Sequence, residues 1–189
     1  MWRNRAARCI GAQCFDLSAE MEHCKAMIFL TVGTQEPFDR LVKAVDEWAG
    51  THDVPVFGQL GRLEAGSYKP HNFTFERFIS ADEFQERLES CTLLVGHAGM
   101  GSIISALTMA KPLLMMARRA SLGEHRNEHQ LSTAARFAGR SGLHVAGEAE
   151  DVGPMIDRLL AEAREPSGAI SPYAQPELIA AVKDFIRGV

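Results

Sequence analysis

Short apolar runs alternate with amphipathic stretches along most of this 189-residue chain, and this alternation constrains the fold most strongly. The first apolar run covers residues 28–32. The stretch that follows carries its apolar side chains at helical spacing, at Phe38, Leu41, Val42, Val45 and Trp48. Strands and helices that alternate at these lengths form βαβ units, which build a parallel sheet covered by helices on both faces. The sequence therefore predicts an α/β domain of the Rossmann-like class.

The same reading assigns elements to the rest of the chain. Further strands are expected at 55–60, 73–79, 92–96, 112–117 and 143–146. Further helices are expected at 81–90, 102–110, 125–139, 150–164 and 177–187, and the last should pack back over the domain. Ser80 followed by Glu83 is typical of a capping box, which marks the start of the helix at 81.

Regular patterning begins only at Met27. Residues 1–26 show no strand or helix period, so we expect a poorly ordered extension there and one folded domain over 27–189. Hydrophobic residues make up 46% of the chain, which is enough for a single core.

Composition excludes several classes of function. With 20 basic and 24 acidic residues the net charge is −4, and no basic face is expected for nucleic acid. No run approaches the ~18 apolar residues that span a bilayer, so we expect a cytoplasmic protein. The four cysteines make no CxxC pair, which argues against a zinc site or a disulfide framework: Cys9, Cys14, Cys24 and Cys91.

A glycine-rich turn, Gly96-His-Ala-Gly-Met-Gly-Ser, links a predicted strand to a predicted helix. Gly99 and Gly101 let the backbone approach a ligand closely, and the helix presents free N–H groups and its positive dipole end. Ser102 adds a hydroxyl, so a phosphate or diphosphate site is expected. The turn matches neither a Walker A loop nor GxGxxG, and a tight turn without ligand stays open.

Two further features lie at predicted strand ends. His97 could donate to a diphosphate oxygen or bond to local backbone, and it is the one catalytic candidate that we name. Gly33 and Thr34 form a second glycine turn after the first strand. Glu36 and Asp39 follow it and could act as bases, although Asp39 also suits the first turn of a helix.

A polar cluster follows the fifth predicted strand. Its members could hydrogen-bond the hydroxyls of a sugar or ribose: Glu124, Asn127, His129 and Gln130. His125 and His129 are four residues apart and could share a helix face, but Arg126 stands where a hydrolytic HExxH motif needs Glu, and no metal is predicted. Arg118 and Arg119 could contact phosphate, a partner or a membrane surface, or be solvated.

Three segments then stand in a fixed order: Met27-Ile-Phe-Leu-Thr-Val-Gly-Thr with Pro37-Phe-Asp-Arg-Leu-Val, Gly96-His-Ala-Gly-Met-Gly-Ser-Ile with Ala106-Leu and Lys111-Pro-Leu, and Glu124-His with Asn127-Glu-His-Gln. Together they resemble the C-terminal domain of glycosyltransferase family 28, over roughly residues 27 to 165. The short stand-alone members are similar, both the bacterial exopolysaccharide subunits and the catalytic subunit of a split eukaryotic transferase that extends dolichol-diphosphate-GlcNAc.

The resemblance implies the C-terminal, donor-binding half of a GT-B glycosyltransferase. It implies that the turn Gly99, Met100, Gly101 and Ser102 lines the diphosphate of a UDP-sugar, that Gly33 and Thr34 close the other side, and that His129 and Gln130 reach the sugar. His97, Glu124, His125 and Asn127 complete the expected binding set.

The acceptor-binding half is missing from the predicted fold. The expected function is therefore that of a donor-binding subunit in a heteromeric, inverting, metal-independent transferase without a cofactor. A membrane-anchored glycosyltransferase subunit would bring a lipid-diphosphate-linked acceptor and hold the chain at the cytoplasmic face of the membrane. The alternatives are a non-catalytic regulatory module that binds nucleotide sugars and a small nucleotide-dependent enzyme such as an epimerase.

Overall fold

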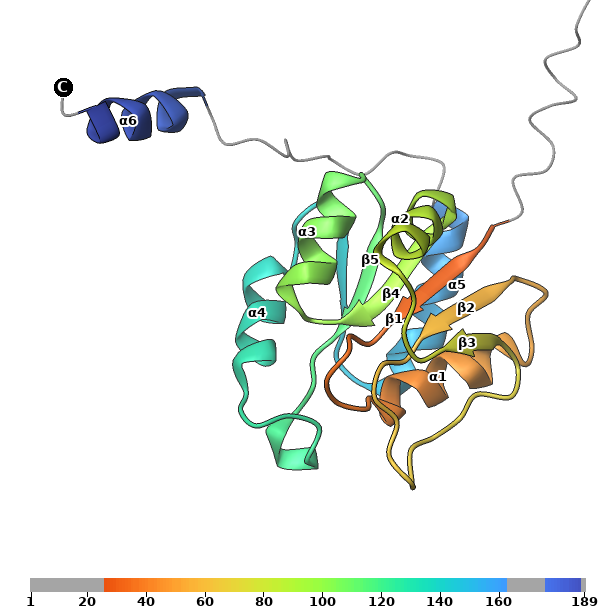
Figure 1. Ribbon diagram of the computed structural model, residues 1–189. Helices are drawn as coiled ribbons and strands as arrows, with labels where there is room; N and C mark the ends of the chain where they lie inside the picture. Colours follow the sequence, from red (N-terminus) through yellow and green to blue (C-terminus); the bar gives the residue numbers. More distant parts are fainter. Residues whose placement is uncertain (1–25, 163–175, 188–189) are drawn as a thin grey trace, which may run out of the picture.

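The computed structural model describes residues 26–162 and 176–187. The predicted extension over 1–26 lies outside the described residues, apart from Ala26. Six parallel strands form one sheet in the order β3-β2-β1-β4-β5-β6 (Figure 1). Their bounds are β1 Ile28–Thr31, β2 Val56–Gln59, β3 Thr74–Glu76, β4 Leu93–His97, β5 Leu113–Met116 and β6 Leu143–Ala146. The Rossmann-like prediction is confirmed.

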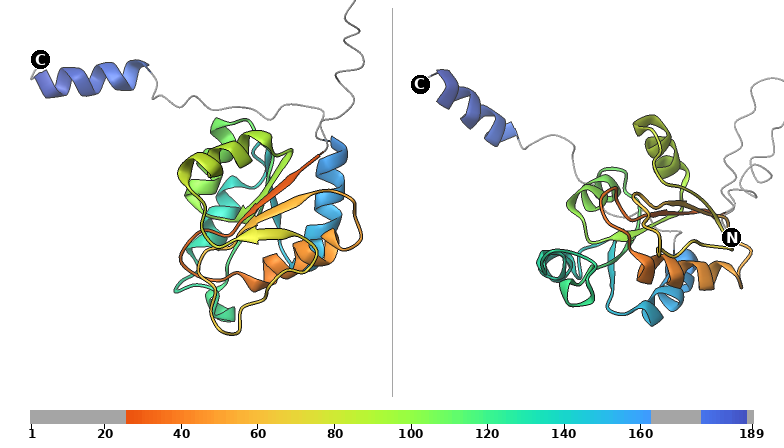
Figure 2. Two further views of the ribbon diagram at one scale, coloured as in Figure 1. Left: turned by 45° about the vertical axis from the view of Figure 1, so that its right-hand side comes forward. Right: turned by 60° about the horizontal axis from the view of Figure 1, so that its bottom comes forward.

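Helices cover both faces of this sheet. Their bounds are α1 Asp39–Ala49, α2 Ala81–Ser90, α3 Met100–Thr108, α4 His129–Phe137, α5 Val152–Glu162 and α6 Pro176–Arg187, with short 3-10 turns η1 Ala120–Leu122 and η2 Ala149–Asp151. Helices α1 and α5 pack on one face, and α2, α3 and α4 contribute to the core on the other (Figure 2). None of the helices in the described ranges is long and apolar enough to cross a membrane.

Strand β1 shows why the apolar runs are continuous. Ile28 and Leu30 belong to the core against α1 and α5, whereas Phe29 belongs to the core on the opposite face. Successive side chains of a strand point to opposite faces, so a strand that is buried on both sides needs no polar alternation. The central strand of the sheet is therefore apolar at every position that packs against helices.

The order of the strands sets where a ligand can lie. Strand β1 pairs with β2 on one side and with β4 on the other, and Thr31 lies opposite Gly96. The strand order thus reverses between β1 and β4. In open α/β sheets, ligands bind outside the carboxyl ends of the strands at such a switch point. The turns after Thr31 and after His97 both open at this point.

Three predictions of local structure need correction. Helix α4 begins at His129 rather than at 125, because 124–128 is an irregular segment after Gly123, whose φ of 71° is left-handed. Strand β3 is shorter than the predicted 73–79. Helix α6 lies apart from the sheet in every view, with Phe185 87% exposed, so the expected packing over the domain is not found (Figures 1 and 2).

The predicted start of α2 is correct. The Ser80 hydroxyl accepts a hydrogen bond from the Glu83 amide at 3.1 Å. This bond satisfies one of the free amides of the first turn. At the other end of α2, the Lys111 ammonium donates to the carbonyl oxygens of Glu89 and Cys91. Cys91 itself is a buried free thiol, and the other cysteines lie outside the described residues.

Candidate functional site

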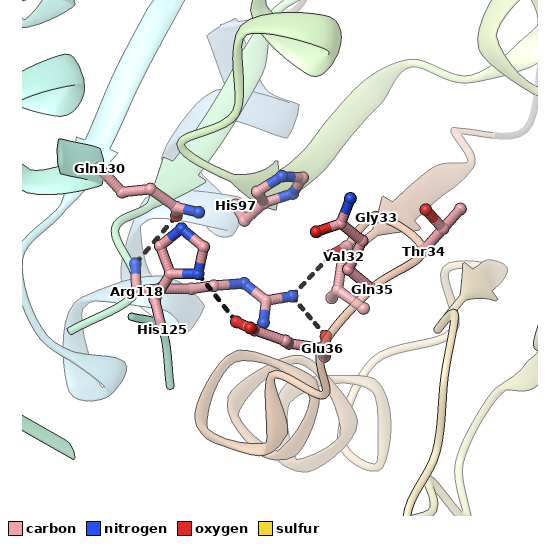
Figure 3. A pocket seen from close by; sticks show the side chains of 9 residues that line it. All are labelled: Val32, Gly33, Thr34, Gln35, Glu36, His97, Arg118, His125 and Gln130. Atoms are coloured by element: carbon pink, nitrogen blue, oxygen red, sulfur yellow. Dashed lines mark hydrogen bonds and ion pairs between the residues drawn. The ribbon is translucent and has the colours of Figure 1, made fainter. Parts of the chain in front are cut away.

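A hollow of about 210 Å³ opens at the switch point between β1 and β4 (Figure 3). Its wall comes from the turn after β1, the end of β4, the end of β5 and the segment that leads into α4. The lining residues are Val32, Gly33, Thr34, Gln35, Glu36, His97, Arg118, His125 and Gln130. The hollow therefore joins four parts of the chain that are far apart in sequence, and we call it the switch-point hollow.

Arg118 holds the turn after β1 in place. Its side chain is 3% exposed, and its guanidinium donates to the carbonyl oxygens of Val32, Glu36 and Pro37 at 2.6 to 2.7 Å. Burial lowers the pKa of this guanidinium. A planar fork of N–H donors suits several carbonyls at once. Arg118 is thus a buried anchor that also lines the hollow, which corrects only the alternative of a solvated surface arginine.

Gly33 takes a conformation that favours glycine. Its φ is +81°, and its carbonyl oxygen accepts a hydrogen bond from the side-chain Nε2 of Gln59 at 3.2 Å. Gly61 also has a positive φ, and a Cβ there would lie 2.3 Å from the Gly33 carbonyl oxygen. The two turns can approach this closely because Gly61 lacks a Cβ. The first predicted glycine turn is therefore part of the wall of the hollow.

The imidazole of His97 packs against two glycines. A Cβ at Gly99 would lie 2.2 Å from the Nε2 atom of His97, and a Cβ at Gly33 would lie 3.1 Å from Cε1. Within the described residues, the buried Nδ1 atom of His97 has no hydrogen-bond partner. Burial lowers the pKa of His97 to about 4, and the charge of Arg118 makes a smaller contribution in the same direction. At neutral pH the ring is uncharged and offers one N–H donor and one acceptor.

The N-terminus of α3 lies beside the hollow. Gly99 is the N-cap and no side chain caps the helix, so the amides of its first turn lack an intrahelical acceptor. A Cβ at Gly101 would meet nothing within 4 Å, and Met100 is 48% exposed. Ser102 is 8% exposed. Of these four predicted residues, Gly101 and Met100 face open space, and none of the four belongs to the lining of the hollow itself.

The predicted polar cluster divides into two groups. Gln130 is 4% exposed and its side-chain oxygen accepts a hydrogen bond from the Arg118 amide at 3.1 Å. His125 lines the hollow and its Nδ1 lies 2.8 Å from Oε2 of Glu36. Asn127 and His129 are exposed and contact each other outside the lining. The structure thus brings His125 and Gln130 to the hollow.

Glu124 has a different environment from the one expected. Its carboxylate receives two hydrogen bonds from Arg40, each 2.8 Å long, and one from the Arg119 amide. Both oxygens are occupied, so Glu124 acts as an anchor of the segment. Sequence reasoning also missed Gln35 as part of the wall. The position of Gln35 directly after the Gly33-Thr34 turn is the only signal that could have found it.

Electrostatics link Glu36 to this cluster. The hydrogen bond from His125 lowers the pKa of the Glu36 carboxyl, with smaller contributions from the charges of His125, Arg118 and Arg126. The rings of His125 and His129 lie 4.7 Å apart in an edge-on arrangement. Over the described ranges, no group of three His, Cys, Asp or Glu residues could hold a metal ion.

The fold and this site define a Rossmann-like domain whose switch-point crevice combines a free helix N-terminus with a polar hollow. Domains of this class bind phosphorylated or nucleotide ligands there. A model of the glycosyltransferase family 28 C-terminal domain matches residues 27–166, and the chain belongs to this family.

Curated relatives of this chain share one name. The human "UDP-N-acetylglucosamine transferase subunit ALG13" is 27% identical over 118 residues, which are 58% of this chain and 10% of that protein. The chain thus spans about a tenth of the length of this relative. The protein of that name from Yarrowia lipolytica is 24% identical over 140 residues, covering 67% of this chain and 68% of its own.

Solved structures show the same fold. A solution structure of ALG13 has 18% identity and a TM-score of 0.52, covering 84% of this chain and 94% of its own. A putative UDP-N-acetylglucosamine 2-epimerase from Listeria monocytogenes has 16% identity and a TM-score of 0.60, covering 95% of this chain and 50% of its own. These likenesses support one half of the GT-B architecture.

Proposed function

We propose that this chain is the donor-binding subunit of a heteromeric glycosyltransferase that uses a UDP-sugar. The observation that carries the proposal is the uncapped N-terminus of α3 beside the switch-point hollow. Free amides and the helix dipole favour a diphosphate at this end, and the neutral imidazole of His97 supplies one further donor. The diphosphate then lies at Gly99 to Ser102 with Gly33 and Thr34 on its other side.

The sugar belongs in the hollow. His125, Gln130 and the turn after β1 surround it with polar groups, which hydrogen-bonded recognition of hydroxyls requires. Asn127 and His129 stand near its outer edge, where they can contact a sugar that extends from it. The names of the relatives support UDP as the nucleotide and N-acetylglucosamine as the first sugar to test.

The reaction is transfer with inversion. A hydroxyl of the acceptor attacks the anomeric carbon while the bond from that carbon to the diphosphate oxygen breaks. The negative charge that develops on the leaving UDP is stabilised by the amides of α3, which are fixed before the reaction begins. No metal and no cofactor are needed for this role, and the base that accepts the hydroxyl proton is not assigned.

A partner subunit completes the proposal. The relatives are named as subunits, which supports assembly with a second chain. In the proposal this second chain is membrane-anchored, binds a lipid-diphosphate-linked acceptor in polysaccharide or glycan synthesis, and holds the donor-binding subunit at the cytoplasmic face. Exopolysaccharide synthesis is the pathway class that we favour for it.

Calorimetric titration with UDP, UDP-GlcNAc, UDP-glucose, UDP-galactose and UDP-glucuronate tests the donor site. Gly101→Trp should abolish binding, because its side chain enters the open space beside the α3 amides without meeting the core. Gly66→Trp is the matched control, since a Cβ there also meets nothing within 4 Å and Gly66 lies outside the site. Equal binding by both variants, or no binding by wild type in the presence of the partner, would contradict the proposal.

A further inference from the structure

Two adjacent residues, Glu124 and His125, tie the segment before α4 to the start of α1. Arg40 donates to both carboxylate oxygens of Glu124, and these two side chains are 17% and 13% exposed. His125 contacts Glu36, four residues before Arg40, at 2.8 Å. We call these four residues the strap. It joins parts of the chain that are 84 to 89 residues apart in sequence.

Arg40 and Glu124 each make a further hydrogen bond besides their mutual pair. Arg40 also donates to the Ala117 carbonyl oxygen at 3.0 Å, and the Arg119 amide donates to Glu124 at 2.9 Å. A bidentate pair of this kind fixes orientation as well as distance, and partial burial strengthens it relative to an exposed pair. The strap therefore holds 117–125 rigidly against the N-terminal end of α1.

The strap connects two adjoining walls of the switch-point hollow. Glu36 belongs to the wall after β1, and His125 and Gln130 belong to the wall before and within α4 (Figure 3). The N-terminus of α3 has separate support, because Ile103 and Ala106 pack in the core beneath it. The strap thus controls the spacing of the hollow without touching the α3 turn.

We propose that Arg40 and Glu124 are positioning residues that preorganise the hollow for the sugar of the donor, while the α3 turn binds the UDP moiety independently. This inference rests on the proposed function. It assigns sugar selectivity to a contact outside the hollow, since neither Arg40 nor Glu124 belongs to its lining. If the pair of Arg40 and Glu124 is broken, the segment 119–129 samples several positions between the anchored Arg118 and Gln130. The hollow then has the arrangement that binds the sugar only part of the time.

Arg40→Gln and Glu124→Gln separate the two parts of the donor. If the competent position is occupied about a tenth of the time, the Kd for UDP-GlcNAc, or for whichever UDP-sugar wild type prefers, rises about tenfold. The Kd for UDP should stay within about twofold, because the α3 turn is unchanged. The double variant should bind no more weakly than either single variant, because all three remove the same interaction.

Two further variants complete the experiment. Lys43→Gln breaks an exposed 3.7 Å pair with Glu47 on the same helix and should leave both affinities unchanged. Arg40→Lys keeps the positive charge but lacks the planar guanidinium that pairs with both carboxylate oxygens. It provides a folded variant if thermal melting shows that Arg40→Gln unfolds. Equal loss of UDP and UDP-sugar binding, or no loss of either, overturns this inference alone. No binding of UDP or UDP-sugar by wild type, with and without the partner, overturns the proposed function and this inference with it.

Discussion

Gly99→Ala should displace the imidazole of His97 by a purely steric effect. The φ of Gly99 is −99° and its ψ is 141°, a conformation that alanine adopts freely, so the backbone itself is not strained. The new Cβ would however lie 2.2 Å from Nε2 and 2.9 Å from Cδ2 of His97. Because comfortable contacts begin near ~3.5 Å, the ring must move by more than about 1 Å.

The ring has little space into which it can move. Gly33 lies against Cε1, and the Nδ1 atom is buried. Overpacking of this kind costs about 1–3 kcal/mol. For a folded unit of this size that corresponds to a fall in Tm of about 3–10 °C. Binding of UDP should weaken as well, because the imidazole that faces the diphosphate has moved.

Differential scanning calorimetry and titration with UDP measure the two effects. Gly101→Ala is the control for stability alone, because its Cβ meets nothing and alanine suits the first turn of a helix. Its Tm should equal or exceed that of wild type. The double variant His97→Ala/Gly99→Ala should lose less stability than the sum of the losses of the two single variants, because the clash disappears when the imidazole is removed. A Gly99→Ala protein with unchanged Tm and unchanged UDP affinity would refute the reasoning.

Two other predictions concern pH and a buried carboxylate. Folding lowers the pKa of His97 to about 4. The unfolded chain therefore binds more protons than the folded chain between about pH 4 and 6.5. The free energy of unfolding should fall by as much as about 3 kcal/mol as the pH is lowered through that window. Urea unfolding at several pH values should show a flatter dependence for His97→Asn, the residual slope coming in part from His144, whose pKa burial also lowers. Asp46 is 1% exposed and accepts hydrogen bonds from the Tyr68 hydroxyl and the backbone amides of His71 and Asn72. Asp46→Ala should lower the free energy of unfolding, measured in urea, by about 3 kcal/mol, because three donors lose their acceptor. Glu47 is exposed on the same helix, and Glu47→Ala should lower the free energy of unfolding by less than about 0.5 kcal/mol. Equal losses for the two variants would count against a stabilising role of the Asp46 carboxylate.

The sequence alone determined the class of fold and the glycine turns of the site. Apolar periodicity reports which face of each element is buried, and every strand of a parallel sheet leaves its carboxyl end at one edge. The turns at Gly33 and at Gly99 could therefore be placed at that edge before any contact was known. The start of α3 at this turn, with no side chain capping it, follows from the same local pattern.

The tertiary structure decided which polar side chains face the hollow. Arg118 and Glu124 both suggested ligand contacts from their positions in the sequence. Glu124 pairs with Arg40 outside the lining, whereas Arg118 lines the hollow and also anchors the carbonyl groups of the turn after β1. Their partners lie more than 80 residues away in sequence. They meet because β1 lies beside β4, which in turn pairs with β5. A local period cannot encode that order, since it arises from packing among all the strands at once, and only the assembled sheet separates anchors from binding residues.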